Sequence, residues 1–377
     1  MQINKCQSVG WFTLLLGASS WYGTADAGTL LVCSTCNHTT IQSAVNDAVD
    51  NDIIKILPGR YVENVTASGK SLTFLGQDLG EPRGAIMVMA AGRGPVFTLG
   101  SGVAGDPAKQ MLLVGLTISG GNHNGGTGVG GGVQVRAGAW LRLVSCTVRG
   151  NYATLGGGVG INSPGAPASS ISDSLIIGND ANGAPPGSPS HGGGVYVAQG
   201  STVEIGHSTI SNNGAAGGGG GIFGEPGSNV TVSFTTVNQN ISDRFNTSQG
   251  QLDGDGGGME TRGDFTIADS DFIGNQSYGT SGGGGLTMAI SDTGPHTITR
   301  STFSHNTLAA EDSPLSGAAI LAFATNPSSY TLDHSYVEQN LSGGAIWNDS
   351  TVTALITSSV IADNVGGNVC SPTVICR

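Results

Sequence analysis

The chain has 377 residues, of which 64 are glycine, and only 11% of its residues are charged. Its apolar content of 38% is too high for a solvated, disordered chain, and its glycines lack the three-residue period of collagen. The formal net charge is −12 and no basic cluster occurs, which argues against nucleic acid as a partner. We therefore expect a folded, glycine-punctuated domain or repeat array.

Residues 1–27 have the features of a secretory signal peptide. Lys5 precedes an apolar stretch over 9–21, and Ala25-Asp26-Ala27 is an A-x-A cleavage site before Gly28. A membrane anchor is the alternative, but the stretch is too short and no stop-transfer pattern follows. We expect residues 28–377 to form one mature domain without a transmembrane anchor, exported to the medium, the cell surface or outer membrane, or the periplasm.

Short cysteine spacings predict a disulfide at each end of the mature chain, because export favours disulfides. The expected pairs are Cys33–Cys36 and Cys370–Cys376. The run CSTCNH (33–38) also resembles part of a haem-attachment or zinc-binding motif. Haem attachment requires C-x-x-C-H, but Asn37 separates Cys36 from His38, and structural zinc requires a second ligand pair. No resident cofactor is therefore expected from these cysteines.

A helix is predicted over residues 39–50. Thr39-Thr40-Ile41-Gln42 is similar to a capping box. One helical face is apolar and consists of Ile41, Ala44, Val45, Ala48 and Val49. Open strand edges recruit other chains, so we expect this helix to close the N-terminal end of the domain.

An asparagine closes a repeat of about 30 residues, since eight copies span 213 residues over seven intervals. These asparagines are Asn151, Asn179, Asn213, Asn240, Asn275, Asn306, Asn340 and Asn364. Counted back from each of them, apolar residues occupy positions −8 and −3, and Ser, Thr or Cys occupies position −5. For Asn275 these residues are Ile267, Phe272 and Ser270.

Similar residues at every second position indicate one face of a strand. The spacing of three between −8 and −5 breaks this alternation and indicates a bend between two strands. A third strand follows each glycine cluster, as in Val133-Gln134-Val135. Three short strands cannot close their own core, so the repeats, over residues of about 60–369, must stack. The inserts between each asparagine and the next glycine cluster have 4, 12, 3, 15, 6, 10, 2 and 1 residues. One corner is therefore free to vary, and such a corner is often where a solenoid binds.

The repeats resemble those of the chlamydial polymorphic outer-membrane proteins, whose tetrapeptides are GGA[ILV] and FxxN. Gly343-Gly344-Ala345-Ile346 matches the first, and Phe272-Ile273-Gly274-Asn275 and Phe303-Ser304-His305-Asn306 match the second. The stretch 40–76 resembles the opening of many bacterial β-helix proteins. The resemblance implies an all-β, right-handed parallel β-helix of the pectin-lyase-like type, in which stacked asparagines form a ladder.

The insert 241–255 and the strand after it hold the candidate catalytic side chains, which are Asp253, Asp255, Glu260 and Arg262. They could serve as acid–base carboxylates of a polysaccharide-cleaving enzyme, and Asp253 with Asp255 could bind calcium. The alternative is that they are acids on a solvated loop. The fragment D-G-D-G lacks the third acid and distal Glu of an EF-hand, and no family catalytic motif is matched.

Other polar and aromatic residues give weaker signals. His207 and His334 precede ladder serines and should point outward, as should Asp269 and Asp271 around Ser270. The sequons at Asn240, Asn275 and Asn340 fall on the inward ladder and should not be glycosylated. We expect an exported binding or adhesion module directed toward glycans or other surface partners; the alternative is a polysaccharide lyase or hydrolase.

Overall fold

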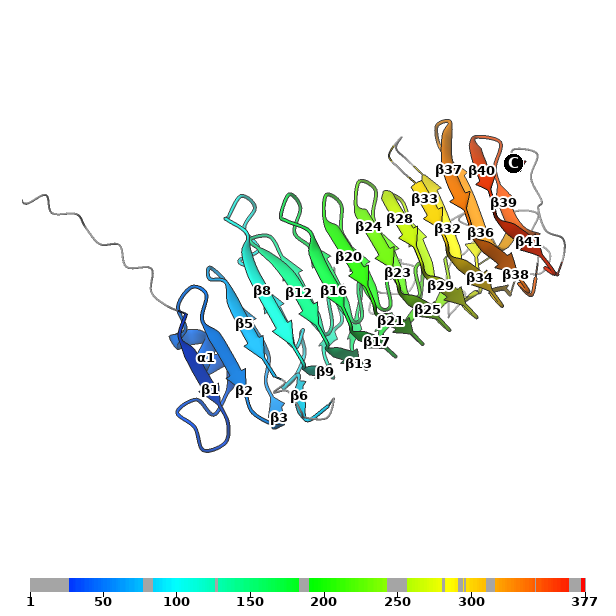
Figure 1. Ribbon diagram of the computed structural model, residues 1–377. Coiled ribbons are helices and arrows are strands. Elements are labelled where there is room, and N and C mark those ends of the chain that lie inside the picture. The colour runs from blue at the N-terminus through cyan, green and yellow to red at the C-terminus, as the bar shows by residue number, and fades with distance from the viewer. Residues whose placement is uncertain are drawn as a thin grey trace, which may run out of the picture.

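The strands stack along one long axis from the N-terminal to the C-terminal end of the molecule (Figure 1). The computed structural model describes residues 27–76, 84–125, 128–182, 190–242, 256–279, 282–290, 294, 296–309, 316–342, 344–365 and 374–376. All strand pairs in its four sheets are parallel. The described residues thus form the expected parallel β-helix with one short helix at its start.

Sheets A and B carry the two strands that precede each ladder asparagine. Sheet A contains β1 (Thr29–Val32), β2 (Ile53–Ile56), β5 (Leu72–Leu75), β8 (Lys109–Val114), β12 (Ala139–Val144), β16 (Ser169–Ser172), β20 (Thr202–Gly206), β24 (Asn229–Ser233), β28 (Asp264–Ala268), β33 (His296–Thr299), β37 (Ser328–Asp333), β40 (Val352–Thr357) and β42 (Val374–Cys376). Sheet B contains β3 (Gly59–Val62), β6 (Ile86–Met89), β9 (Thr117–Ser119), β13 (Thr147–Arg149), β17 (Leu175–Ile177), β21 (Thr209–Ser211), β25 (Thr236–Asn238), β29 (Asp271–Ile273), β34 (Thr302–Ser304), β38 (Tyr336–Glu338) and β41 (Val360–Ala362).

Sheet C carries the strand after each glycine cluster, and a small sheet D follows the asparagines. Sheet C contains β4 (Val65–Ala67), β7 (Phe97–Leu99), β11 (Val133–Arg136), β15 (Val159–Asn162), β19 (Val195–Val197), β23 (Ile222–Gly224), β27 (Met259–Thr261), β31 (Gly282–Gly283), β32 (Leu286–Ile290), β36 (Ser316–Ala324) and β39 (Gly344–Asn348). Sheet D contains β10 (Asn122–His123), β14 (Tyr152–Ala153), β18 (Asp180–Ala181), β22 (Gly214–Ala215), β26 (Ile241–Ser242), β30 (Gln276–Ser277) and β35 (Thr307–Leu308). The three predicted strands are present in the coils, and sheet D adds a two-residue strand that was not predicted.

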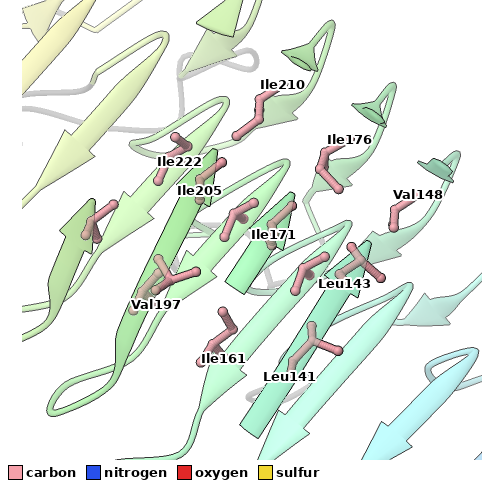
Figure 2. Close-up of a cluster of buried hydrophobic side chains, with 14 of the residues drawn as sticks. Leu141, Leu143, Val148, Ile161, Ile171, Ile176, Val197, Ile205, Ile210 and Ile222 are labelled. Atoms are coloured by element: carbon pink, nitrogen blue, oxygen red, sulfur yellow. The ribbon is translucent and has the colours of Figure 1, made fainter. Parts of the chain in front are cut away.

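The core runs the length of the coil as stacks of aliphatic and aromatic side chains. Figure 2 shows one portion, in which Leu143, Ile171 and Ile205 project inward from successive strands of sheet A. Each of these side chains is buried. The predicted inward positions are therefore confirmed, and the stack places equivalent apolar groups against each other at every turn.

Two bends per coil keep the ladder residues inside. The residue before each ladder Ser, such as Asp269 (φ 49°), and the residue before each ladder Asn, such as Gly274 (φ 63°), are left-handed. A left-handed residue turns the chain without needing a loop. The Oγ atom of Ser301 then accepts from the backbone N–H of Ser270 in the preceding coil at 3.2 Å. The break in the two-residue alternation between positions −8 and −5 is thus a bend made by one residue.

The glycine clusters are required for two different reasons. Gly219, in the glycine run 217–221, has φ of +66°, a conformation that glycine adopts without steric penalty. Gly258 lacks a positive φ, but a Cβ there would lie 2.5 Å from the backbone oxygen of Gly285 in the next coil. The glycine excess of the sequence therefore reflects tight turns and close approach of neighbouring coils.

The N-terminal end is closed by α1 (Ile41–Asp47), which is shorter than the predicted 39–50. Its N-cap is Thr40, whose Oγ1 accepts from Ser43 N, and the helix ends because Ala48 is extended. Ile41, Ala44, Val45 and Ala48 are buried as predicted. The placement of Val49 on that face was wrong, because it lies beyond the helix and is 55% exposed.

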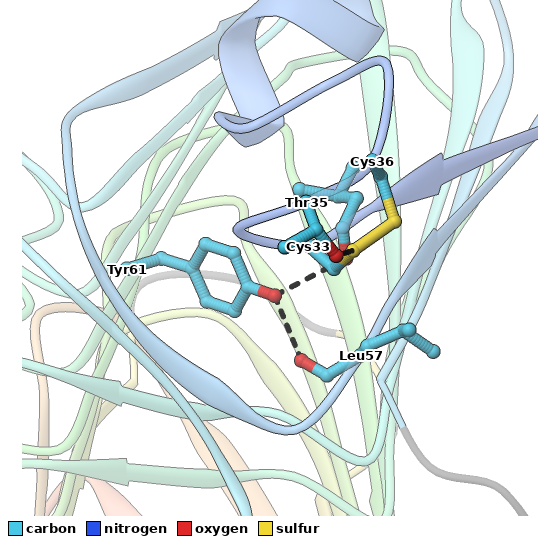
Figure 3. The surroundings of a disulfide bond; sticks show 6 residues. Cys33, Thr35, Cys36, Leu57 and Tyr61 are labelled. Carbon is cyan, nitrogen blue, oxygen red and sulfur yellow. Dashed lines mark hydrogen bonds between the residues drawn. A yellow bond between two sulfur atoms is a disulfide. The ribbon is translucent and has the colours of Figure 1, made fainter.

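A disulfide between Cys33 and Cys36 follows β1, as predicted (Figure 3). The hydroxyl of Tyr61 donates to the carbonyl oxygens of Val32 at 3.2 Å and Leu57 at 2.8 Å. These bonds tie the turn after β1 to β2 and β3. Cys370 lies outside the described residues, so its pairing with Cys376 stays a prediction.

Candidate functional site

The outer face of sheet C gathers aromatic and charged side chains from three successive coils. Tyr196, Phe223 and Glu260 are register partners at the centres of β19, β23 and β27. Their inward neighbours, such as Val195 and Ile222, occupy the core. Because side chains alternate across a strand, these three project outward in one row. We call this row, together with His191, Glu225 and Arg262, the sheet C cluster.

The cluster is buried although it faces outward from the coil. Glu260 and Phe223 are fully buried and Tyr196 is 6% exposed. Residues from the corners before and after sheet C cover the row and form a second, small hydrophobic cluster. Its members are Val129, Tyr196, Ala198 and Phe223, with Leu155 packed against them. Where the corner before sheet C is described, it therefore packs on that sheet through residues such as Val129 and Leu155.

Glu260 holds Arg262 over an aromatic ring. Its Oε1 accepts from Arg262 Nε at 2.9 Å and lies 2.9 Å from Nη2. The guanidinium carbon lies 5.2 Å from the centroid of Phe223, within the range of a cation–π interaction. The Arg262 side chain is 29% exposed. An arginine fixed by a buried carboxylate and a ring is thus presented at the surface in one orientation.

The structure places Glu260 and Arg262 of the four candidate residues and rules out the solvated-loop alternative for Glu260. Glu260 is not on a solvated loop, because it lies in the centre of β27 with its carboxylate fully buried. Arg262 follows it and lies beside it, as expected from their spacing. Asp253 and Asp255 lie outside the described residues. Their proposed roles in catalysis and in calcium binding therefore stay predictions.

His191 also belongs to the cluster, although no sequence pattern singles it out. Its ring stacks on Phe223 with centroids 4.2 Å apart and an angle of 14°, and its Nδ1 accepts from Gly218 N at 3.0 Å. Burial, with a smaller effect of the Arg262 charge, lowers the pKa of His191 to about 3, although the Gly218 bond opposes the shift. The imidazole is therefore neutral at physiological pH, with its proton on Nε2.

Tyr196 connects the cluster to the turn that leaves sheet C. Its hydroxyl donates to Glu225 Oε1 at 2.9 Å. Burial and the Glu225 charge raise the pKa of Tyr196 well above its usual range, so it stays a hydrogen-bond donor. Glu225 is half-buried, and it follows β23 as Arg262 follows β27. An acid and a base thus lie side by side on successive coils at the edge of the cluster.

The ladder asparagines are structural. Asn240, Asn275, Asn306 and Asn340 are fully buried, which agrees with the expectation that the sequons at Asn240, Asn275 and Asn340 face inward. His207 and His334 are exposed, also as predicted. Asp271 is exposed, and Asp269 forms a two-bond pair with Arg300 at 2.7 and 2.6 Å on the outside of the coil.

Two shallow pockets lie away from the cluster. One of about 370 Å³ lies beside sheet A and is lined by Gly294, His296, Pro327, Ser328, Ser329, Thr351 and Thr353. The other, of about 380 Å³, lies beside β1 and the Cys36 turn. Neither gathers charged side chains as the sheet C cluster does, so we base the functional argument on the cluster. Within the described ranges, no three His, Cys, Asp or Glu side chains are placed to hold a metal ion.

The parallel coils, the asparagine ladder and the glycine corners define a sequence pattern that is matched by the model of the right-handed β-helix region over residues 131–361. The chain belongs to this right-handed β-helix family. No curated protein matches its sequence. The helix of the described part is not long or apolar enough to cross a bilayer.

Two solved structures have a similar fold. One is a pectin methylesterase from Aspergillus niger, with 11% identity and a TM-score of 0.40 over 91% of this chain and 87% of that chain. The other is an alginate lyase from Paenibacillus sp. str. FPU-7, with 13% identity and a TM-score of 0.44 over 92% of this chain and 98% of that chain. At these values the likeness concerns the fold alone.

Proposed function

We propose that this β-helix is an exported binding module that recognises glycans at the sheet C cluster. The observation that carries the proposal is the fixed, partly exposed Arg262, held over Phe223 by the buried Glu260. Its planar, fork-shaped guanidinium is suited to bind two oxygen atoms at once. The Cys33–Cys36 disulfide supports export, since disulfides persist in oxidising compartments.

A neutral, hydroxyl-rich glycan fits the cluster better than a polyanion. Small-ligand sites combine apolar and aromatic walls with a few oriented polar groups. Here Arg262 and Glu225 follow neighbouring strands, Glu225 accepts from the Tyr196 hydroxyl, and the rings of His191 and Tyr196 stack on Phe223. The net charge of −12 repels acidic polysaccharides at long range. The GGA[ILV] and FxxN tetrapeptides, similar to those of outer-membrane proteins, support a role at a cell surface.

The test is binding of the mature protein to neutral and to uronate-containing polysaccharides, measured by pull-down and calorimetry. We expect binding to a neutral polymer, and Arg262→Ala should weaken it about tenfold or more, the scale of an anchoring arginine. Arg262→Lys should not restore binding, because an ammonium lacks the fork. Arg300→Ala, which removes an exposed arginine on another face, is the matched control. Equal affinity of Arg262→Ala and wild type would reject the proposal.

The second candidate is a polysaccharide-acting enzyme, which is favoured by the proximity of Glu260, Arg262 and the neutral imidazole of His191. A carboxylate and a neutral imidazole are the usual general acids and bases. The same polysaccharides are therefore assayed for new reducing ends and unsaturated uronates, with and without calcium. Turnover that Glu260→Gln or Asp255→Asn abolishes would establish the enzyme and displace the binding proposal.

A further inference from the structure

Asp52 is a buried carboxylate at the point where the mature chain is expected to begin. It lies just before β2 and is 4% exposed. Its Oδ2 accepts from Val49 N at 2.8 Å, and its Oδ1 accepts from Gly28 N at 2.7 Å. None of the ion pairs between described residues includes Asp52. A buried charge is costly unless it is paired, so a cationic partner would stabilise this carboxylate.

Gly28 is fixed on both sides of its peptide unit. Its N–H points to Asp52, and its carbonyl oxygen accepts from Ile53 N at 2.8 Å as the first bond of the β1–β2 ladder. A Cβ on residue 28 would lie 3.0 Å from Asp52 Oδ1, closer than a side chain normally approaches. Glycine at this position therefore lets the main-chain nitrogen reach the carboxylate.

We propose that hydrolysis of the Ala27–Gly28 bond creates an α-ammonium group that pairs with Asp52 and locks the N-terminal end of the β-helix. A signal peptidase breaks the C–N bond, water supplies the oxygen of the new Ala27 carboxylate, and the Gly28 nitrogen leaves as an amine that takes up a proton at neutral pH. The nitrogen already lies 2.7 Å from Oδ1. Processing thus converts an amide-to-carboxylate hydrogen bond into an ammonium–carboxylate ion pair without moving the backbone.

The neighbouring charged groups have other partners. Asp50 accepts from Ser71 N at 2.6 Å and pairs with Lys109 at 3.3 Å. Lys70 donates to the carbonyl oxygens of Val45 at 2.7 Å and Ala48 at 2.5 Å, at the end of α1. The new ammonium group would therefore lie beside the Asp52 carboxylate, whereas the Lys70 ammonium group is bound at the end of α1.

The first test is the mass of the exported protein, whose N-terminal peptide should begin at Gly28. A mature chain that begins at another residue would overturn the proposal. The second test is a double-mutant cycle of thermal unfolding at one scan rate. Chains that begin at Gly28 or one residue earlier, at Ala27, are each compared with and without Asp52→Asn.

In that cycle Asp52→Asn should lower the Tm more in the chain that begins at Gly28, by an additional 3 °C or so, the scale expected for an interaction of this kind. Asp50→Asn, two residues away and exposed, is the matched control and should lower both chains equally. An equal effect of Asp52→Asn in the two chains would contradict the ion pair.

A labelling experiment keeps the proposal testable if Asp52→Asn does not fold. Acetylation of the α-amine at neutral pH should be several-fold slower in the native chain that begins at Gly28 than in the one that begins at Ala27. The reason is that only the former amine is held as an ammonium group against Asp52. Equal labelling rates in the two native chains would overturn the proposal.

Discussion

Asn275 Nδ2 donates to Asn306 Oδ1 at 3.0 Å, and the same oxygen accepts from the backbone N–H of Asn275 at 3.0 Å. The second hydrogen of Nδ2 goes to the carbonyl oxygen of Val237 at 2.9 Å. Both amide hydrogens and both lone pairs are thus used, since Asn275 Oδ1 accepts in turn from Asn240. The ladder needs a side chain that donates and accepts at once, and asparagine provides both functions.

Asn275→Asp should lower the free energy of unfolding by at least about 3 kcal/mol at neutral pH, because it removes both donors and buries a charge beside the oxygen of Asn306. Chemical denaturation measures the change. Asn162→Asp, at an exposed position at the end of β15, is the control and should change stability little. Equal unfolding of Asn275→Asp and wild type would reject the ladder as a source of stability.

Gly258→Ala should be strongly destabilising, because its Cβ would lie 2.5 Å from the oxygen of Gly285 and 3.0 Å from the Asn275 amide. Overpacking of this kind costs about 1–3 kcal/mol, and here the obstacle is backbone that cannot rotate away. Gly92→Ala is the matched control, since its backbone φ is not positive and a Cβ there meets nothing within 4 Å. A neutral Gly258→Ala in thermal unfolding would show that neighbouring coils can separate.

His191 should make the protein less stable in mild acid. Its folded pKa is about 3 against an ordinary 6.5, so the unfolded chain binds the proton more tightly between these values. The contribution is complete above pH 6.5 and is lost as the pH falls toward 3, which amounts to about 2 kcal/mol at pH 5. His191→Gln should show a correspondingly smaller loss between pH 7.5 and pH 5 in denaturant titrations. The same pH dependence in both proteins would contradict the assignment.

The two arginine–carboxylate pairs should differ in their effect on stability. Glu260→Gln should cost about 3 kcal/mol, because it replaces the buried carboxylate that pairs with the partly exposed Arg262 by a weaker, neutral partner. Asp269→Asn removes the exposed pair with Arg300 and should leave the denaturation midpoint unchanged, since exposed pairs contribute little. The prediction fails if the Asp269 variant is the less stable of the two.

The repeat could be predicted because inward positions are chemically uniform from coil to coil. Phe272, Phe303 and Val337 occupy the same place on sheet B, and the slip before each ladder serine marks a real bend. Sheet D was missed because two-residue strands such as Gly214–Ala215 are too short to show alternation. The helix was overextended because Val49 continues the apolar period, although Ala48 already has extended backbone.

The site was only partly predictable, since its burial depends on residues that do not repeat. The spacing of Glu260 and Arg262 indicated that they lie together, but alternation alone places Glu260 on an outer face. What encloses it includes a ring from another coil, Phe223, on which His191 stacks. No periodic signal links these residues, because they come from the variable corner and from the outward positions of sheet C.

The measurement that tests the central claim most directly is hydrogen exchange of the mature protein with and without its best-bound neutral glycan. We predict that protection increases at the turns that leave sheet C beside the cluster, around Glu225 and Arg262, and that Arg262→Ala abolishes the increase. Protection confined to sheet B, or to the sheet A pocket around Ser328 and Thr351, would contradict recognition at the sheet C cluster.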